Sequence, residues 1–133
     1  MVESFADDLK HRYEACRLKG HLNYYAAYIF LVLAVLCSAV ATLSIATDQF
    51  SKSVNALLAA FPGVLYLANK QFRFEERSKW WYEKFYVIEG LYRALVFEGK
   101  EVAEVSKELT IKSKELAARW PGFGEAPGSS GLI

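Results

Sequence analysis

Residues 22–47, LNYYAAYIFLVLAVLCSAVATLSIAT, form an uncharged run of 26 residues in a chain of 133. A bilayer core about 30 Å thick is crossed by roughly 20 apolar residues of α-helix. A soluble domain of this size is too small to bury such a run on every face of a helix. The run therefore predicts a membrane-spanning helix over about residues 24–46.

A cleaved signal peptide is the alternative to a membrane anchor, because Ala39-Val40-Ala41 has the A-x-A form that signal peptidase reads. The apolar run starts late, however, after a leader that carries four acidic and four basic residues. The run also continues to Thr47, well past the cleavage position. Both features favour a span that stays in the mature protein.

A second apolar segment follows closely. Lys52 and Lys70 flank the 17 uncharged residues SVNALLAAFPGVLYLAN, and lysines at both ends can reach the headgroups and extend a short span. Pro62 and Gly63 predict a kink or a break near its centre. A re-entrant segment is the alternative to a full span. We expect a transmembrane hairpin over residues 22–69, with spans over about 24–46 and 53–69.

The basic residues near the two apolar segments predict the orientation. The leader and the segment after residue 69 are rich in Lys and Arg, whereas the connecting turn over residues 48–53 has only Lys52. The positive-inside rule then places both termini in the cytoplasm, in a multi-pass protein of the cell inner membrane. The flanking basic residues are Lys10, Arg12, Arg17, Lys19, Lys70, Arg73, Arg77, Lys79 and Lys84.

The leader, residues 1–21, has the spacing of an amphipathic helix, with charges between its apolar positions. Such a helix could lie at the membrane surface or mediate self-association. A partly ordered cytoplasmic leader is the alternative. The apolar positions are Phe5, Leu9, Tyr13, Cys16 and Leu18.

The charged C-terminal half predicts a cytoplasmic helical hairpin over residues 70–121. Its first helix has an apolar seam spaced 4, 3, 4, 3, which is typical of a coiled coil, and Gly99 can end it in the left-handed conformation. Its second helix ends before Trp120-Pro121-Gly122, and residues 122–133 form a flexible tail. The fold class is therefore an all-α membrane protein, a two-helix transmembrane hairpin followed by a cytoplasmic amphipathic helical hairpin. The seam comprises Trp81, Phe85, Ile88, Tyr92 and Leu95.

Neither nucleic-acid binding nor catalysis is predicted. The net charge is +1, from 16 basic and 15 acidic residues that are interleaved, whereas a phosphate binder concentrates Lys and Arg on one face. The two histidines, His11 and His21, lack partners at metal-ligand spacing. No phosphate loop and no nucleophile with a base is present. We expect no catalytic, cofactor-binding or metal site.

The polar residues of the spans leave two interpretations open. Ser38, Thr42, Ser44 and Asn55 are the candidates. They could hydrogen-bond between helices or back to the i−4 carbonyl, or they could line a weakly polar pore. Two helices cannot enclose an aqueous path, so a pore would require a homo-oligomer. Small residues four apart, such as Ala56 and Ala60, would allow close helix contact.

The order of these parts resembles the SLATT family of small two-transmembrane effector domains, which are associated with bacterial nucleotide-second-messenger and SLOG systems. The stretch that carries the resemblance is residues 73–122, RFEERSKWWYEKFYVIEGLYRALVFEGKEVAEVSKELTIKSKELAARWPG, with its charged run into Lys79-Trp80 and its closing Trp120-Pro121. The resemblance extends over about 100 residues. It implies an effector of bacterial conflict or antiviral immunity that oligomerises into a membrane pore when a nucleotide-sensing or nucleotide-synthesising partner activates it. A non-conducting scaffold or accessory subunit that docks a cytoplasmic partner is the alternative.

Overall fold

The structure, a computed structural model, describes residues 1–122. These residues form four α-helices and no strand: α1 (Val2–Thr47), α2 (Lys52–Phe72), α3 (Phe74–Val96) and α4 (Val102–Ala118). The described part of the chain is thus all-α, as the sequence predicts. The predicted flexible tail lies outside the described residues, apart from Gly122.

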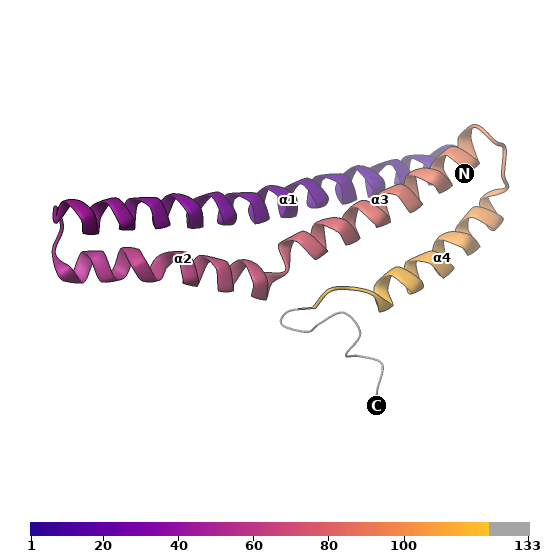
Figure 1. Cartoon of the computed structure of the whole chain (residues 1–133). Helices are drawn as coiled ribbons and strands as arrows, with labels where there is room; N and C mark the ends of the chain where they lie inside the picture. Colours follow the sequence, from indigo (N-terminus) through magenta and orange to yellow (C-terminus); the bar gives the residue numbers. More distant parts are fainter. Residues whose placement is uncertain (123–133) are drawn as a thin grey trace, which may run out of the picture.

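Helix α1 is a single rod of 46 residues, or about 69 Å at 1.5 Å per residue. It runs from the N-terminus to the opposite tip of the molecule (Figure 1). The polarity of the sequence changes near Leu22, but the helix does not end there, and no proline interrupts it. The leader is helical and forms the first half of α1, which continues without a break into the apolar run.

Helix α2 returns beside the second half of α1 (Figure 1). The turn between them begins at Asp48, which ends α1 in the left-handed conformation with φ 52°, and an aspartate tolerates that conformation. Ser51 caps α2 by accepting a hydrogen bond from the N–H of Val54 at 3.4 Å. Of the predicted kink or break at Pro62 and Gly63, the break does not occur, because α2 continues through both residues.

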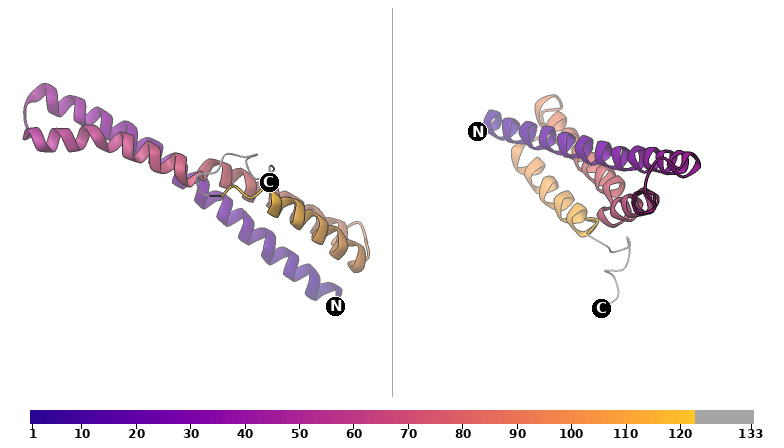
Figure 2. Two further views of the ribbon diagram at one scale, coloured as in Figure 1. Left: turned by 90° about the horizontal axis from the view of Figure 1, so that it is seen from below. Right: turned by 90° about the vertical axis from the view of Figure 1, so that its left-hand side faces the viewer.

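Helix α3 packs against the first half of α1, and α4 packs against α3 (Figure 2). Tyr13 of α1 meets Phe85 and Tyr92 of α3 edge to face, with ring centroids 5.8 and 5.5 Å apart. The predicted seam thus lies in a core, but its main partner is α1, where the sequence suggested α4. The reason is that the apolar face of the leader, left unpartnered in the sequence analysis, runs antiparallel to the seam. The buried residues of this core are Leu9, Cys16, Ile88, Leu91, Leu95 and Val105.

One face of α1 serves both partner helices. Buried and half-buried residues recur along it at alternating spacings of three and four over the whole length of the helix. The first half of this stripe faces α3 and the second half faces α2. The stripe comprises Ala6, Leu9, Tyr13, Cys16, Gly20, Asn23, Ala27, Phe30, Ala34, Cys37, Ala41 and Ser44.

The facing stripes of α2 and α3 are out of phase with each other. On α2 the half-buried positions are 55, 58, 62, 65, 68 and 69, of which 55, 58, 62, 65 and 69 follow alternating spacings of three and four. Continued at the same spacings into α3, they would fall on 76, 79, 83, 86, 90 and 93, which are all exposed. The stripe that α3 presents instead occupies 78, 81, 85, 88, 92 and 95, two residues later. At 100° per residue, this offset is a rotation of about 200°.

The break between α2 and α3 supplies that rotation. Arg73 alone separates the helices and has the left-handed backbone conformation, with φ 52° and ψ 41°. A non-glycine residue pays roughly 1–2 kcal/mol for this conformation. No proline or glycine lies within residues 64–89, so local sequence does not impose the break. We infer that burial of both stripes against α1 offsets its cost.

Candidate functional site

The second half of α1 exposes an apolar surface. Among the described residues, α1 is the one helix long and apolar enough to cross a membrane, and only 11% of its most apolar 18-residue window is buried. The core helix of a soluble protein would be mostly buried, because apolar side chains exposed in such number are unfavourable in water. The large side chains that are at least half exposed in this segment are Tyr24, Tyr25, Tyr28, Ile29, Leu31, Val35, Leu36, Leu43 and Ile45.

The four polar candidates do not gather on one surface. The hydroxyl of Ser44, which is buried, donates to Oδ1 of Asn55 and so links α1 to α2. The side-chain amide of Asn55 also donates to the carbonyl of Phe50 at 3.4 Å. The exposed Thr42 hydroxyl donates to the carbonyl of Ser38 at 2.9 Å, within its own helix. Two candidates therefore lie between the helices and two lie on the exposed face of α1.

Small residues form part of the outer face of α2. Ala56, Ala59, Ala60 and Gly63 are all exposed, and a Cβ atom added at Gly63 would meet nothing within 4 Å. By contrast, Ala34 of α1 is half-buried in the stripe that faces α2. The small residues of α2 are thus not used in packing the two helices of one chain together.

A polar cluster joins α1 to α3 just before the apolar run. Ser78 donates through its hydroxyl to the carbonyl of Gly20 at 2.9 Å, and the Tyr82 hydroxyl lies 2.8 Å from Nδ1 of His21. A Cβ atom on Gly20 would lie 3.3 Å from the Tyr82 ring, so glycine allows the close approach. This cluster was not predicted from the sequence. The sequence signal for it is Gly20, a glycine inside a helical pattern, which can mark a close approach of another helix.

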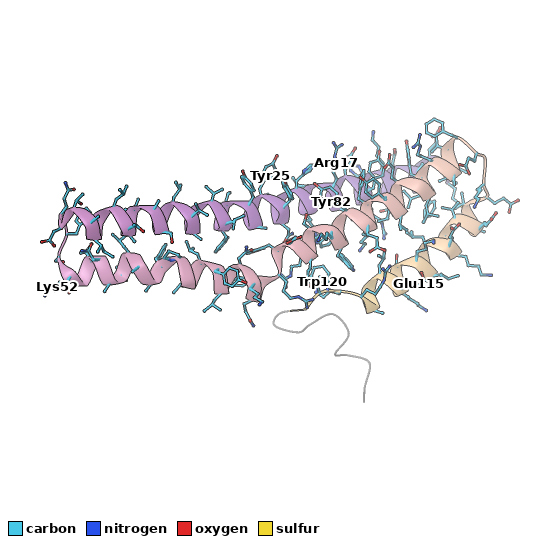
Figure 3. The ribbon with its side chains drawn as sticks, viewed as in Figure 1. Arg17, Tyr25, Lys52, Tyr82, Glu115 and Trp120 are labelled. Atoms are coloured by element: carbon cyan, nitrogen blue, oxygen red, sulfur yellow. The ribbon has the colours of Figure 1, made fainter. Side chains whose placement is uncertain are left out.

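The C-terminal end of α4 is held against the start of α3. The Trp80 indole donates to the carbonyl of Leu116 at 2.8 Å, and the rings of Trp80 and Trp120 lie 4.5 Å apart. Arg119 pairs with Glu83 at 2.7 Å. Figure 3 shows Trp120 beside the start of α3. The tryptophans therefore pack between helices of the polar half.

The left-handed joint belongs to the same assembly. The Arg73 side chain is only 7% exposed and forms an ion pair with Glu76, and its Nη1 donates to the carbonyl of Gly122 at 3.3 Å. The Arg77 guanidinium lies 5.4 Å from the Trp120 ring centroid, a favourable cation–π distance. The segment that follows α4 thus contacts residues on α3 and at its start.

Electrostatic effects are modest in the described part of the chain. Glu75 and Lys79, which are four residues apart on α3, form an ion pair at 2.7 Å, and its hydrogen bond lowers the pKa of Glu75 and raises that of Lys79. Burial raises the pKa of the Cys16 thiol, although Lys84 and Lys19 oppose this shift. Among residues 1–122, no three His, Cys, Asp or Glu side chains cluster in a way that could hold a metal ion.

The arrangement is therefore an apolar helix pair joined to a three-helix polar half through a bent joint. The Ser44–Asn55 hydrogen bond joins the two apolar helices, Trp120 packs at the joint, and the outer face of the apolar pair is exposed. No protein-family model, no curated protein and no solved structure matches this chain.

Proposed function

We propose that the chain is a two-span protein of the bacterial inner membrane with both termini in the cytoplasm. Helix α1 would cross the bilayer over residues 24–46, and α2 would return over residues 53–69. The antiparallel packing of α1 and α2 supports this proposal, as does the absence of any charged residue between Lys52 and Lys70. The lysines would reach the headgroups on either side.

Topology can be tested by cysteine labelling with a membrane-impermeant maleimide. In intact cells, a cysteine at Ser51 should react, because the α1–α2 turn faces outward in the proposed topology. A matched cysteine at Ser106, which is exposed on α4, should react only after the cells are permeabilised. Equal labelling of both positions in intact cells would contradict the two-span topology.

We further propose that the chain acts as an effector that self-associates in the membrane and forms a pore, under the control of a nucleotide-sensing or nucleotide-synthesising partner. The observation that carries this proposal is the exposed apolar surface of α1 and α2, which includes the open position at Gly63. Helices that expose small residues can approach a neighbouring helix closely in lipid. The nature of the partner rests on the family resemblance alone.

Propidium iodide uptake after induced expression together with the activating partner would test pore formation. Active pores should admit the dye, and Thr42→Val should change the conductance, since Thr42 lies on the exposed face of α1. Ser44→Ala is the matched control, because Ser44 is buried against α2 and its loss should leave the permeation path unchanged. Membranes that stay intact at verified membrane expression and activation would sink this proposal.

A specific observation also favours the second candidate, a non-conducting scaffold that docks a cytoplasmic partner. The bonds Ser44–Asn55 and Thr42–Ser38 engage polar groups of the apolar half within one chain. A scaffold needs no polar path across the bilayer. The scaffold hypothesis predicts that the protein is a stable monomer in nanodiscs, co-purifies with a defined partner and carries no current. A ring-shaped oligomer would instead favour the pore.

A further inference from the structure

We propose that the segment 116–122 is a latch that, together with the packing of α2 and α3 against α1, holds Arg73 in its left-handed conformation. When the latch is released, Arg73 returns to the right-handed helical conformation, and α2 and α3 join into one continuous helix. This conformational control goes beyond the proposed function and does not depend on whether the chain conducts.

The first step of the argument is that the sequence of the joint is compatible with a continuous helix. Residues 69–77, NKQFRFEER, contain neither glycine nor proline. The backbone is also nearly continuous there, since the N–H of Arg73 donates to Asn69 at 3.1 Å and the N–H of Arg77 donates to Arg73 at 3.0 Å. Only the dihedral angles of Arg73 separate the two helices. Strain at a single residue persists when its surroundings hold it there.

The second step is that the contacts which hold the joint, besides the packing of both stripes against α1, come from the far end of the described chain. Gly122 accepts a hydrogen bond from the buried Arg73 side chain, and the Trp120 ring lies against Arg77. Pro121 between them is buried. Gly122 is 49 residues from Arg73, so the contacts of this segment can be lost without unfolding either helix next to the joint.

The third step is that joining α2 and α3 into one continuous helix would remove the α3 stripe from α1. The stripes of α2 and α3 are two residues out of phase, so a continuous helix cannot present both of them to α1. If α2 keeps its place beside α1, the α3 stripe must turn away by about 200°. Cys16, which is now 5% exposed in the core between α1 and α3, would then become accessible. The α3 seam would become free to meet another chain.

Cys16 therefore provides a native reporter for the state of the latch. The full-length protein, carrying Cys37→Ala so that Cys16 is its one thiol, is placed in nanodiscs and treated with a water-soluble maleimide. The loss of three ring contacts in Trp120→Ala should speed the labelling of Cys16 about tenfold. Ile111→Ala is the matched control, because Ile111 lies on the exposed face of α4 and should label at the parent rate. Unchanged labelling of Trp120→Ala would overturn the latch.

A second pair of variants tests the backbone of the joint. Arg73→Gly and Arg73→Ala both remove the side chain and its contacts with Glu76 and Gly122. Glycine adopts the left-handed conformation without cost and weakens a continuous helix, whereas alanine does the opposite. We expect Cys16 to react at least about fivefold more slowly in Arg73→Gly than in Arg73→Ala. Equal rates at matched helix content by circular dichroism would show that opening does not pass through Arg73, and would overturn the hinge.

Discussion

Replacing Leu9 by alanine tests whether the leader is packed against α3 or lies free of it. Leu9 is 0% exposed and lies in the core that α1 forms with α3 and α4. The substitution removes three buried carbon atoms, which at about 0.8 kcal/mol each amounts to about 2.4 kcal/mol. The cavity that remains adds to this loss, so we expect the free energy of unfolding to fall by about 3 kcal/mol.

The tryptophans make this loss measurable without unfolding the apolar half. All three of them, Trp80, Trp81 and Trp120, lie where α3 meets the end of α4. Tryptophan fluorescence during a urea titration in nanodiscs should therefore report the polar half of the molecule. The midpoint for Leu9→Ala should move to lower urea with an unchanged slope.

Leu18→Ala is the matched control, because Leu18 lies in the same helix but is 60% exposed. This variant should remain within about 0.5 kcal/mol of the parent protein. A helix lying on the membrane surface would leave Leu9 without a protein core, and the two variants would then behave alike. Equal midpoints for the two variants would refute the packing of the leader against α3.

Three further outcomes are expected. Burial raises the pKa of Cys16 above its usual value of 9.0, so the folded state favours the neutral thiol. The contribution of Cys16 to the free energy of unfolding is fully present below about pH 9 and is lost as pH rises through the folded-state pKa. This pH dependence of the free energy of unfolding should disappear in Cys16→Ala. A double-mutant cycle of Ser44→Ala and Asn55→Ala in bilayers should give a coupling of about 0.6–1.7 kcal/mol, measured by steric trapping; additive effects would show that the hydrogen bond does not link the helices. Trp80→Phe should cost about 1 kcal/mol because the Leu116 carbonyl loses the indole donor and keeps only the N–H of Arg119. Hydrogen exchange of α4 should accelerate while that of α1 does not.

Local chemistry predicted several helix ends correctly. Gly99 follows α3 in the left-handed conformation, with φ +70°, as expected for the one residue type that adopts it freely. Helix α4 ends at Ala118, shortly before Trp120-Pro121, because the residue before proline avoids the helical conformation. The Glu75–Lys79 pair also follows from helical spacing alone. These features depend only on neighbours within one turn.

The partners of the helices could not be predicted in the same way. The change from charged to apolar residues near Leu22 suggests a boundary in the sequence, but it changes the side chains of the helix and not its backbone. The apolar stripe of the leader was visible through Leu9 and Tyr13, yet several helices could have covered it. The conformation of Arg73 had no local signal at all, because arginine is a good helix former. It follows from long-range packing.

The phase difference between α2 and α3 makes the length of the joint a structural variable. A chain with two fewer residues between positions 69 and 78 would bring both stripes into one register along α1, and no left-handed residue would be needed. Such a chain would be a plain antiparallel hairpin of two long helices. The number of residues between the α2 and α3 stripes therefore determines whether a bend at Arg73 is needed. An insertion or deletion there would alter which face of α3 meets α1 without changing a single apolar side chain.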